Sequence, residues 1–74
     1  MTMEMIYVDS QGIDQIGYDE SMGEAHVIFK RSGHYIYSEV SQEVWERFRD
    51  SPSKGTFVNE ELKAKSFPFR KVSD

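Results

Sequence analysis

The sequence predicts a small α+β domain, in which an antiparallel β-meander of three to four strands precedes two helices packed on one sheet face. The first half alternates apolar and polar residues with a period of two, and glycine-containing loops divide it into strands. The second half carries helix caps and helical spacing instead. Strands followed by helices are typical of α+β folds, and 74 residues suffice for one domain, 1–74. Residues 5–8 are the candidate fourth strand, at an edge of the sheet.

Two short loops set the predicted strand register. The three central strands are expected at residues 13–19, 24–30 and 34–39. A four-residue loop then pairs Asp19 with Glu24, and a three-residue loop ending in Gly33 pairs Lys30 with His34. Because side chains alternate between faces, both hairpins place one apolar set together. This inner face consists of Ile16, Tyr18, Ala25, Val27, Phe29, Tyr35 and Tyr37.

The opposite, outer face of the predicted sheet is mostly polar, as a solvated face should be. Its candidate partner residues are Ile13, Ile28, Ile36 and His34, with Ile28 opposite Ile36. Apolar residues grouped on a small face can form a dimer or partner patch, although scattered surface apolar residues are also ordinary. His26 and His34 share this face but are not opposite each other, so no metal site is predicted.

The helices begin at capping residues. Ser41 can cap the first helix, which ends before Pro52 because the residue preceding a proline disfavours helical geometry. The second helix lies within residues 53–66. Its start is open: Ser53 can cap a longer helix, or Asn59 a shorter one.

A series of different short motifs, in a characteristic order and spacing, extends over nearly the whole chain, about residues 6–70. They are Ile13 to Asp19, Phe29 with Ser32-Gly33, Tyr35-Ile36-Tyr37, Val40, Val44-Trp45, Ser53-Lys54-Gly55, and Phe57-Val58-Asn59 with Leu62. Together they resemble the KTSC domain family, a short bacterial domain named for the C-terminus of some lysyl-tRNA synthetases and also found alone. The family usually has Gly-Val-Pro where this chain has Glu39-Val40-Ser41. The resemblance implies a domain of unassigned activity, with RNA binding suggested by its attachment to a synthetase.

Charge is distributed unevenly along the chain, whose formal net charge is −4. Residues 1–46 sum to −7, whereas residues 47–74 sum to +3. A nucleic-acid partner requires clustered basic side chains, and the basic half supplies the only candidates. They are Lys54, Lys63, Lys65, Arg70 and Lys71. A small domain that simply shows both signs to water would give the same asymmetry.

The sequence predicts binding rather than catalysis. It contains no cysteine and no His-x-x-x-His, His-Glu-x-x-His or Gly-x-Ser-x-Gly pattern. Ser53-Lys54-Gly55 falls short of a phosphate-binding Walker loop, and Tyr35 and Tyr37 lie on the helix-covered face, which favours a core role over base stacking. We therefore expect no enzyme activity, cofactor or metal.

Two functions remain open at this point. The first is RNA or tRNA binding through the basic C-terminal half. The second is a protein-interaction or homo-oligomerisation role for the outer sheet face. The absence of cysteine, of a membrane-spanning run and of a basic signal-peptide start predicts a cytoplasmic protein.

Overall fold

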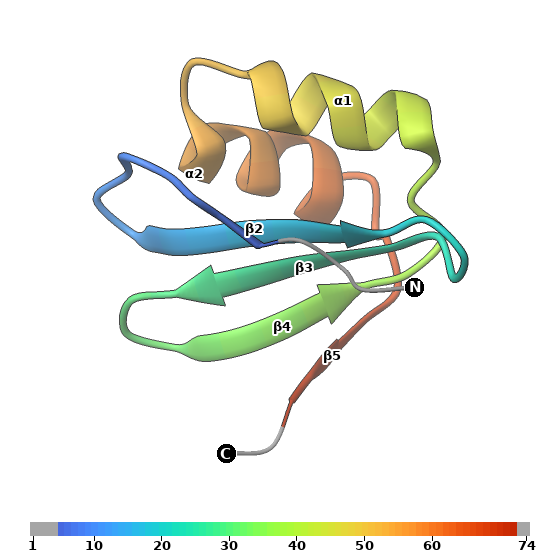
Figure 1. The fold of residues 1–74 in the computed structure, drawn as a ribbon, viewed down its shortest axis with the longest axis horizontal. Helices are drawn as coiled ribbons and strands as arrows, with labels where there is room; N and C mark the ends of the chain where they lie inside the picture. The colour runs from blue at the N-terminus through green and yellow to red at the C-terminus, as the bar shows by residue number, and fades with distance from the viewer. Residues whose placement is uncertain (1–4, 73–74) are drawn as a thin grey trace.

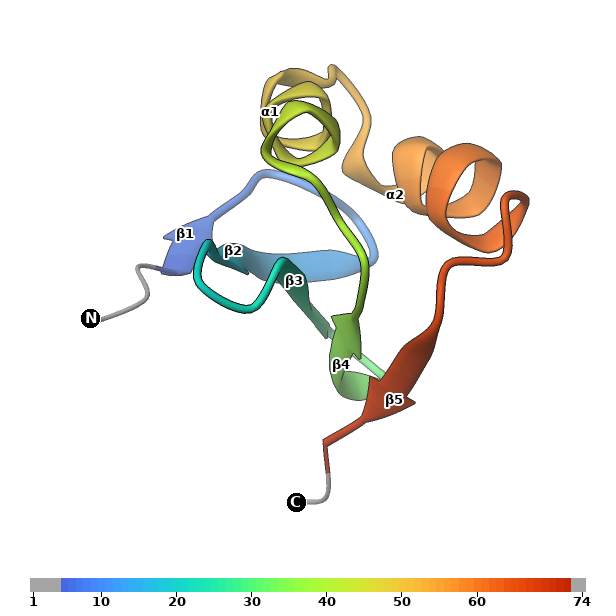
Figure 2. The same cartoon turned by 90° about the vertical axis from the view of Figure 1, so that its right-hand side faces the viewer.

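The computed structural model describes residues 5–72, which form one antiparallel sheet with its helices on a single face (Figures 1 and 2). The strands follow chain order across the sheet: β1 (Met5–Tyr7), β2 (Ile13–Asp19), β3 (Glu24–Phe29), β4 (Gly33–Tyr37) and β5 (Phe69–Lys71). The helices are α1 (Gln42–Asp50) and α2 (Lys54–Phe57), and α2 continues directly into a π-helical segment, η1 (Val58–Lys63). Among these residues, no helix is long and apolar enough to cross a membrane. The predicted lack of a signal-peptide start concerns residues 1–4, outside the described part.

The first hairpin has the predicted register. Asp19 pairs with Glu24, and Tyr18 with Ala25. The Asp19 carboxylate orders the loop by accepting hydrogen bonds from the Ser21 hydroxyl at 2.8 Å and from the Ser21 N–H at 3.1 Å. The Ser21 side chain is the main reason that the pKa of Asp19 is lowered. Gly23 closes the loop at φ 67°, a conformation that glycine adopts without strain.

The second hairpin differs from the prediction by two residues. Val27 pairs with Tyr35, whereas we expected Tyr37 at that position. Gly33 is the first residue of β4 and pairs with Phe29, so the three-residue loop is 30–32 rather than 31–33. A shift of two preserves the alternation of side chains, and the predicted inner face is therefore correct although its pairs are not.

A β-bulge in β2 overturns the placement of Ile13 on the outer face. Ile13 pairs with Phe29 and Gln15 with Ile28, so Asp14 is the extra residue. The inserted residue reverses the alternation, and Ile13 becomes completely buried in the core. The prediction that Ile13 belongs to a partner face is wrong for this reason.

Both edges of the sheet are short strands. Residues 5–7 form the predicted edge strand and pair with β2. At the other edge, β5 returns after the helices and pairs with β4, which gives one strand more than predicted (Figure 2). Residues 69–71 were too short a run to be recognised as a strand.

The core lies between the sheet and the helices. From the helices it receives Trp45, Phe48, Phe57, Val58 and Leu62, which pack on the buried residues of β2, β3 and β4. The rings of Phe48 and Phe57 stack with centroids 5.1 Å apart and join the two helices.

Hydrogen bonds fix where each helix begins. The Ser41 hydroxyl accepts from the Val44 N–H at 3.2 Å, and the Ser53 hydroxyl accepts from the Thr56 N–H at 3.3 Å. Of the two predicted starts of the second helix, the Ser53 cap is confirmed.

The segment before α1 is attached to the first hairpin at Val40. The Tyr18 hydroxyl donates to the Val40 carbonyl at 2.6 Å, and the Val40 N–H donates to the Gly23 carbonyl at 2.9 Å. Both backbone polar groups of Val40 are therefore satisfied by the first hairpin.

Candidate functional site

A shallow cavity of about 240 Å³ lies where the helical layer ends and β5 joins the sheet. We call it the aromatic cleft. It is lined by Phe29, Ser32, Tyr35, Tyr37, Lys63 and Phe69. These residues come from β3, the following loop, β4, the end of η1 and β5. Segments distant in sequence thus build the cleft together.

The aromatic rings form a continuous wall. Phe29 meets Tyr35 edge-on with centroids 5.4 Å apart, and Phe69 lies 6.0 Å from Tyr35 and 5.6 Å from Tyr37. Exposure rises along this wall: Tyr37 is 2% exposed, Phe29 and Tyr35 are partly buried, and Phe69 is 61% exposed. The prediction of a core role therefore holds for Tyr37, whereas Tyr35 reaches the cleft.

Burial also sets the chemistry at the base of the cleft. It raises the pKa of the Tyr37 phenol, with a smaller contribution from Tyr35. Tyr37 is therefore a neutral phenol at neutral pH. The base of the cleft carries no charge, and its polarity comes from hydroxyl groups and from the lysines around it.

Two of the predicted basic residues adjoin the cleft. Lys63, the last residue of η1, contributes to its lining. Lys71 pairs with Tyr35 in the β4–β5 ladder, and Phe69 pairs with Tyr37. Because alternate residues of a strand share a face, Lys71 lies on the same side of the sheet as the aromatic wall.

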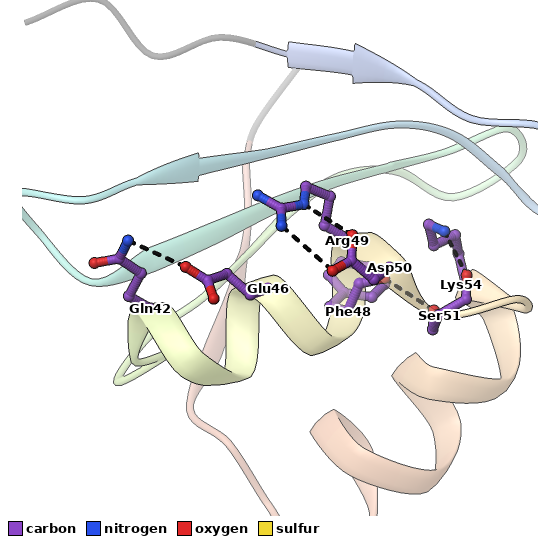
Figure 3. A network of polar contacts seen from close by, with 7 residues as sticks. All are labelled: Gln42, Glu46, Phe48, Arg49, Asp50, Ser51 and Lys54. Carbon is purple, nitrogen blue, oxygen red and sulfur yellow. Dashed lines mark hydrogen bonds and ion pairs between the residues drawn. The ribbon is translucent and has the colours of Figure 1, made fainter.

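The other three predicted basic residues have intramolecular partners elsewhere. Lys54 donates to the Ser51 carbonyl at 2.6 Å, at the corner where α1 gives way to α2 (Figure 3). Lys65 pairs with Glu61 at 2.9 Å on the helix surface. Arg70 points to the outer face and pairs with Glu24. The five predicted residues do not form one basic surface.

Polar side chains of the outer face pair with one another and cover the apolar residue between them. Arg70 lies opposite Ile36 and reaches Glu24 of β3 with nitrogen–oxygen distances of 3.0 and 3.4 Å. His26 lies opposite Ile36 on the other side. Ile36 is consequently only 7% exposed, and its placement as an available partner residue is wrong.

The remaining predicted partner residues are Ile28 and His34. They lie opposite each other, contrary to the expected pairing of Ile28 with Ile36, and both are partly buried. The register error also placed His26 too far from His34. In the structure they are diagonal neighbours, and the His26 Nδ1 and His34 Nε2 atoms are 2.8 Å apart. Within residues 5–72, no group of three or more His, Asp or Glu residues is arranged to hold a metal ion.

A second cavity, of about 270 Å³, lies between α1 and the β1–β2 edge. Its lining combines Glu20 and Glu46 with Arg49. Arg49 is bound to Asp50 at 3.1 Å, and Glu46 accepts from Gln42 at 3.2 Å (Figure 3). The pairing with Asp50 raises the pKa of Arg49 and lowers that of Asp50. Although this cavity is slightly larger, its acidic lining does not suit an anionic ligand.

The fold and the cleft together define a class: a small α+β domain with all its helices on one sheet face and an aromatic groove at the sheet edge. The sequence model of the KTSC domain matches residues 9–67, and the chain belongs to this family. The structure is similar to the crystal structure of a KTSC domain protein from Yersinia pestis, with 30% sequence identity and a TM-score of 0.91. That match covers 97% of this chain and 100% of the other. A search of the curated proteins finds no match.

Proposed function

We propose that this KTSC domain is a non-catalytic RNA-binding module that holds an unpaired base in the aromatic cleft. The observation that carries the proposal is the exposed Phe69 ring beside two lysines, Lys63 and Lys71. Unpaired bases stack on aromatic side chains, and neighbouring lysines contact the phosphates. The suggestion of RNA binding that accompanies the family gives the same direction.

The electrostatics point to a single strand rather than a duplex. A duplex is held mainly through its phosphates, which requires an extended basic surface. Here the net charge is −4, and the basic residues are divided among separate places on the surface. Stacking is worth about 1–3 kcal/mol per base and does not require a basic surface. A stacked base with two phosphate contacts therefore fits this charge distribution better.

The proposal gives a definite salt dependence. With phosphate contacts from Lys63 and Lys71 only, the slope of log affinity against log salt should be about −1.4 for a single strand. A surface that used all five predicted basic residues would give a slope of about −3.5. Fluorescence anisotropy with labelled single-stranded RNA, over a series of salt concentrations, distinguishes the two.

The test of the cleft is Phe69→Ala, measured in the same assay. We expect affinity for single-stranded RNA to fall about 5- to 160-fold, as the loss of one stacking ring predicts. The matched control is Tyr7→Ala, which removes another exposed ring, 76% exposed, from the opposite edge strand. The control should bind as the parent does. An equal loss in both variants, or no binding by the parent at low salt, would contradict the proposal.

The second candidate, a partner surface on the outer sheet face, has less support. Ile13 is in the core and Ile36 is covered, which leaves Ile28 as the one apolar residue of the predicted set that is still partly exposed. If the chain fails to bind RNA, association through this face is the next hypothesis. Sedimentation of the parent and of an Ile28→Asp variant would then test it.

A further inference from the structure

The outer face of the sheet contains a pair of imidazoles in direct contact. His26 of β3 and His34 of β4 are diagonal neighbours, since His26 pairs with Ile36 and His34 with Ile28. The His26 Nδ1 and His34 Nε2 atoms lie 2.8 Å apart, and the ring planes are inclined by 53°. The pair is on the opposite side of the sheet from the aromatic cleft, and it has no part in the proposed function.

We propose that His26 and His34 form a binding site for a late first-row divalent cation, Cu²⁺ first and Ni²⁺ second, with water completing the coordination. Neutral imidazole is a common ligand of these ions. In the metal-free pair, one nitrogen donates its proton to the other. A cation bound beside the two nitrogens replaces the shared proton, which exchanges through water to the other nitrogen of the same ring.

The choice of ion follows from the ligand type. The 2.8 Å separation is that of the hydrogen bond between the rings, so an ion would lie beside the line that joins the two nitrogens. For nitrogen ligands, the affinity of divalent first-row ions is greatest for Cu²⁺, ahead of Ni²⁺ and Zn²⁺.

The charged groups around the pair favour a cation over an anion. The charged groups that face His26 are Glu24, Asp19 and Arg70. Glu24 and Arg70 neutralise each other in their ion pair, and Asp19 contributes a net negative charge that favours a cation. The two central strands hold both rings in place.

Titration with CuCl₂ at neutral pH tests the site, using the whole chain without a polyhistidine tag. By isothermal titration calorimetry, the parent chain should bind one equivalent of Cu²⁺. In His26→Gln and in His34→Gln, this binding should be lost or its affinity should fall at least about tenfold. The double variant should bind Cu²⁺ with about the same affinity as the single variants, because one imidazole alone does not make the site. Unchanged Cu²⁺ binding in the double variant would overturn the proposal, since the ion would then be bound elsewhere.

A second measurement does not depend on the variants folding. Electron paramagnetic resonance of the parent chain with one equivalent of Cu²⁺ should show a tetragonal spectrum with nitrogen coupling from two imidazoles. A copper spectrum without imidazole coupling would refute the assignment.

Discussion

The two faces of the sheet differ in whether their polar and aromatic side chains have partners within the protein. The three residues of β5 show the difference. Arg70 points to the outer face, where it joins Glu24 across Ile36. Phe69 and Lys71 point to the other face, where the Phe69 ring is left largely exposed. On the outer face, internal pairs satisfy the charged and imidazole groups. At the cleft, an apolar ring and two lysines are exposed together, and this contrast is the reason to place binding there.

The largest expected effect separates the base of the cleft from its rim. Tyr37→Ala removes a buried ring and should lower the free energy of unfolding by about 3–5 kcal/mol. Phe69→Ala removes a largely exposed ring and should change it by about 0.5 kcal/mol or less. Urea denaturation of both variants checks the comparison. If Phe69→Ala destabilises as strongly as Tyr37→Ala, the rim is a structural element and the division between base and rim is wrong.

Next in size is the ion pair of the outer face. Arg70→Ala leaves Glu24, which is 9% exposed, without its partner, and should destabilise the fold by about 1–3 kcal/mol. It should also increase hydrogen exchange at the β4–β5 ladder, because Arg70 joins β5 to β3. Lys71→Ala is the control on the same strand and should leave stability nearly unchanged. Equal stability of the two variants would mean that the outer face is not closed by this pair.

A smaller effect is expected where the sheet connects to the first helix. Glu39 has φ 59°, a left-handed conformation that disfavours any side chain with a Cβ. Glu39→Gly should therefore raise the free energy of unfolding by about 1 kcal/mol, and thermal unfolding would measure it. Ser66, at φ 58° after the second helix, provides an independent repeat in Ser66→Gly. The control is Gly55→Ala, at a position without a positive φ, which should not lower the free energy of unfolding.

The smallest effect is a pH dependence from the outer face. The pKa of His26 is lowered in the folded protein, so the unfolded chain binds the proton more tightly. Stability should therefore be full above the unfolded value of about 6.5 and should fall as the pH drops from there through the folded pKa. Urea denaturation between pH 5 and pH 8 would show the loss. The same decrease in a His26→Gln variant would assign it to other groups.

Sequence patterns were sufficient for the fold class, for the inner face and for the capped start of the first helix, whereas the start of the second helix was left open between Ser53 and Asn59. Strand alternation predicted the inner face correctly even though the second hairpin was shifted by two residues, because such a shift conserves sidedness. The bulge at Asp14 was not predictable in the same way, since a single inserted residue leaves no trace in the hydrophobic pattern. It alone misplaced Ile13.

The candidate site could be predicted only in part. Lys63 and Lys71 were among the basic residues selected, but charge alone did not separate them from Lys54, Lys65 and Arg70. The partners of Lys54 and Lys65 lie 3 and 4 residues away along the chain, whereas the partner of Arg70 lies 46 residues away. Phe69 was missed because its role depends on β5 pairing with β4, a contact between residues more than thirty positions apart. Alternation across Phe69, Arg70 and Lys71 was the one signal that could have found it.

The two hydrogen bonds at Val40 also bear on the order of folding. The Tyr18 hydroxyl and the Gly23 carbonyl that hold Val40 both belong to the first hairpin, so α1 has no fixed starting point until that hairpin has formed. Local contacts form early because they close short loops, and the first hairpin is local. We therefore expect the β2–β3 hairpin to act as the template on which the helical layer assembles. The aromatic cleft, which needs β5 as well, would then be among the last parts of the molecule to be completed.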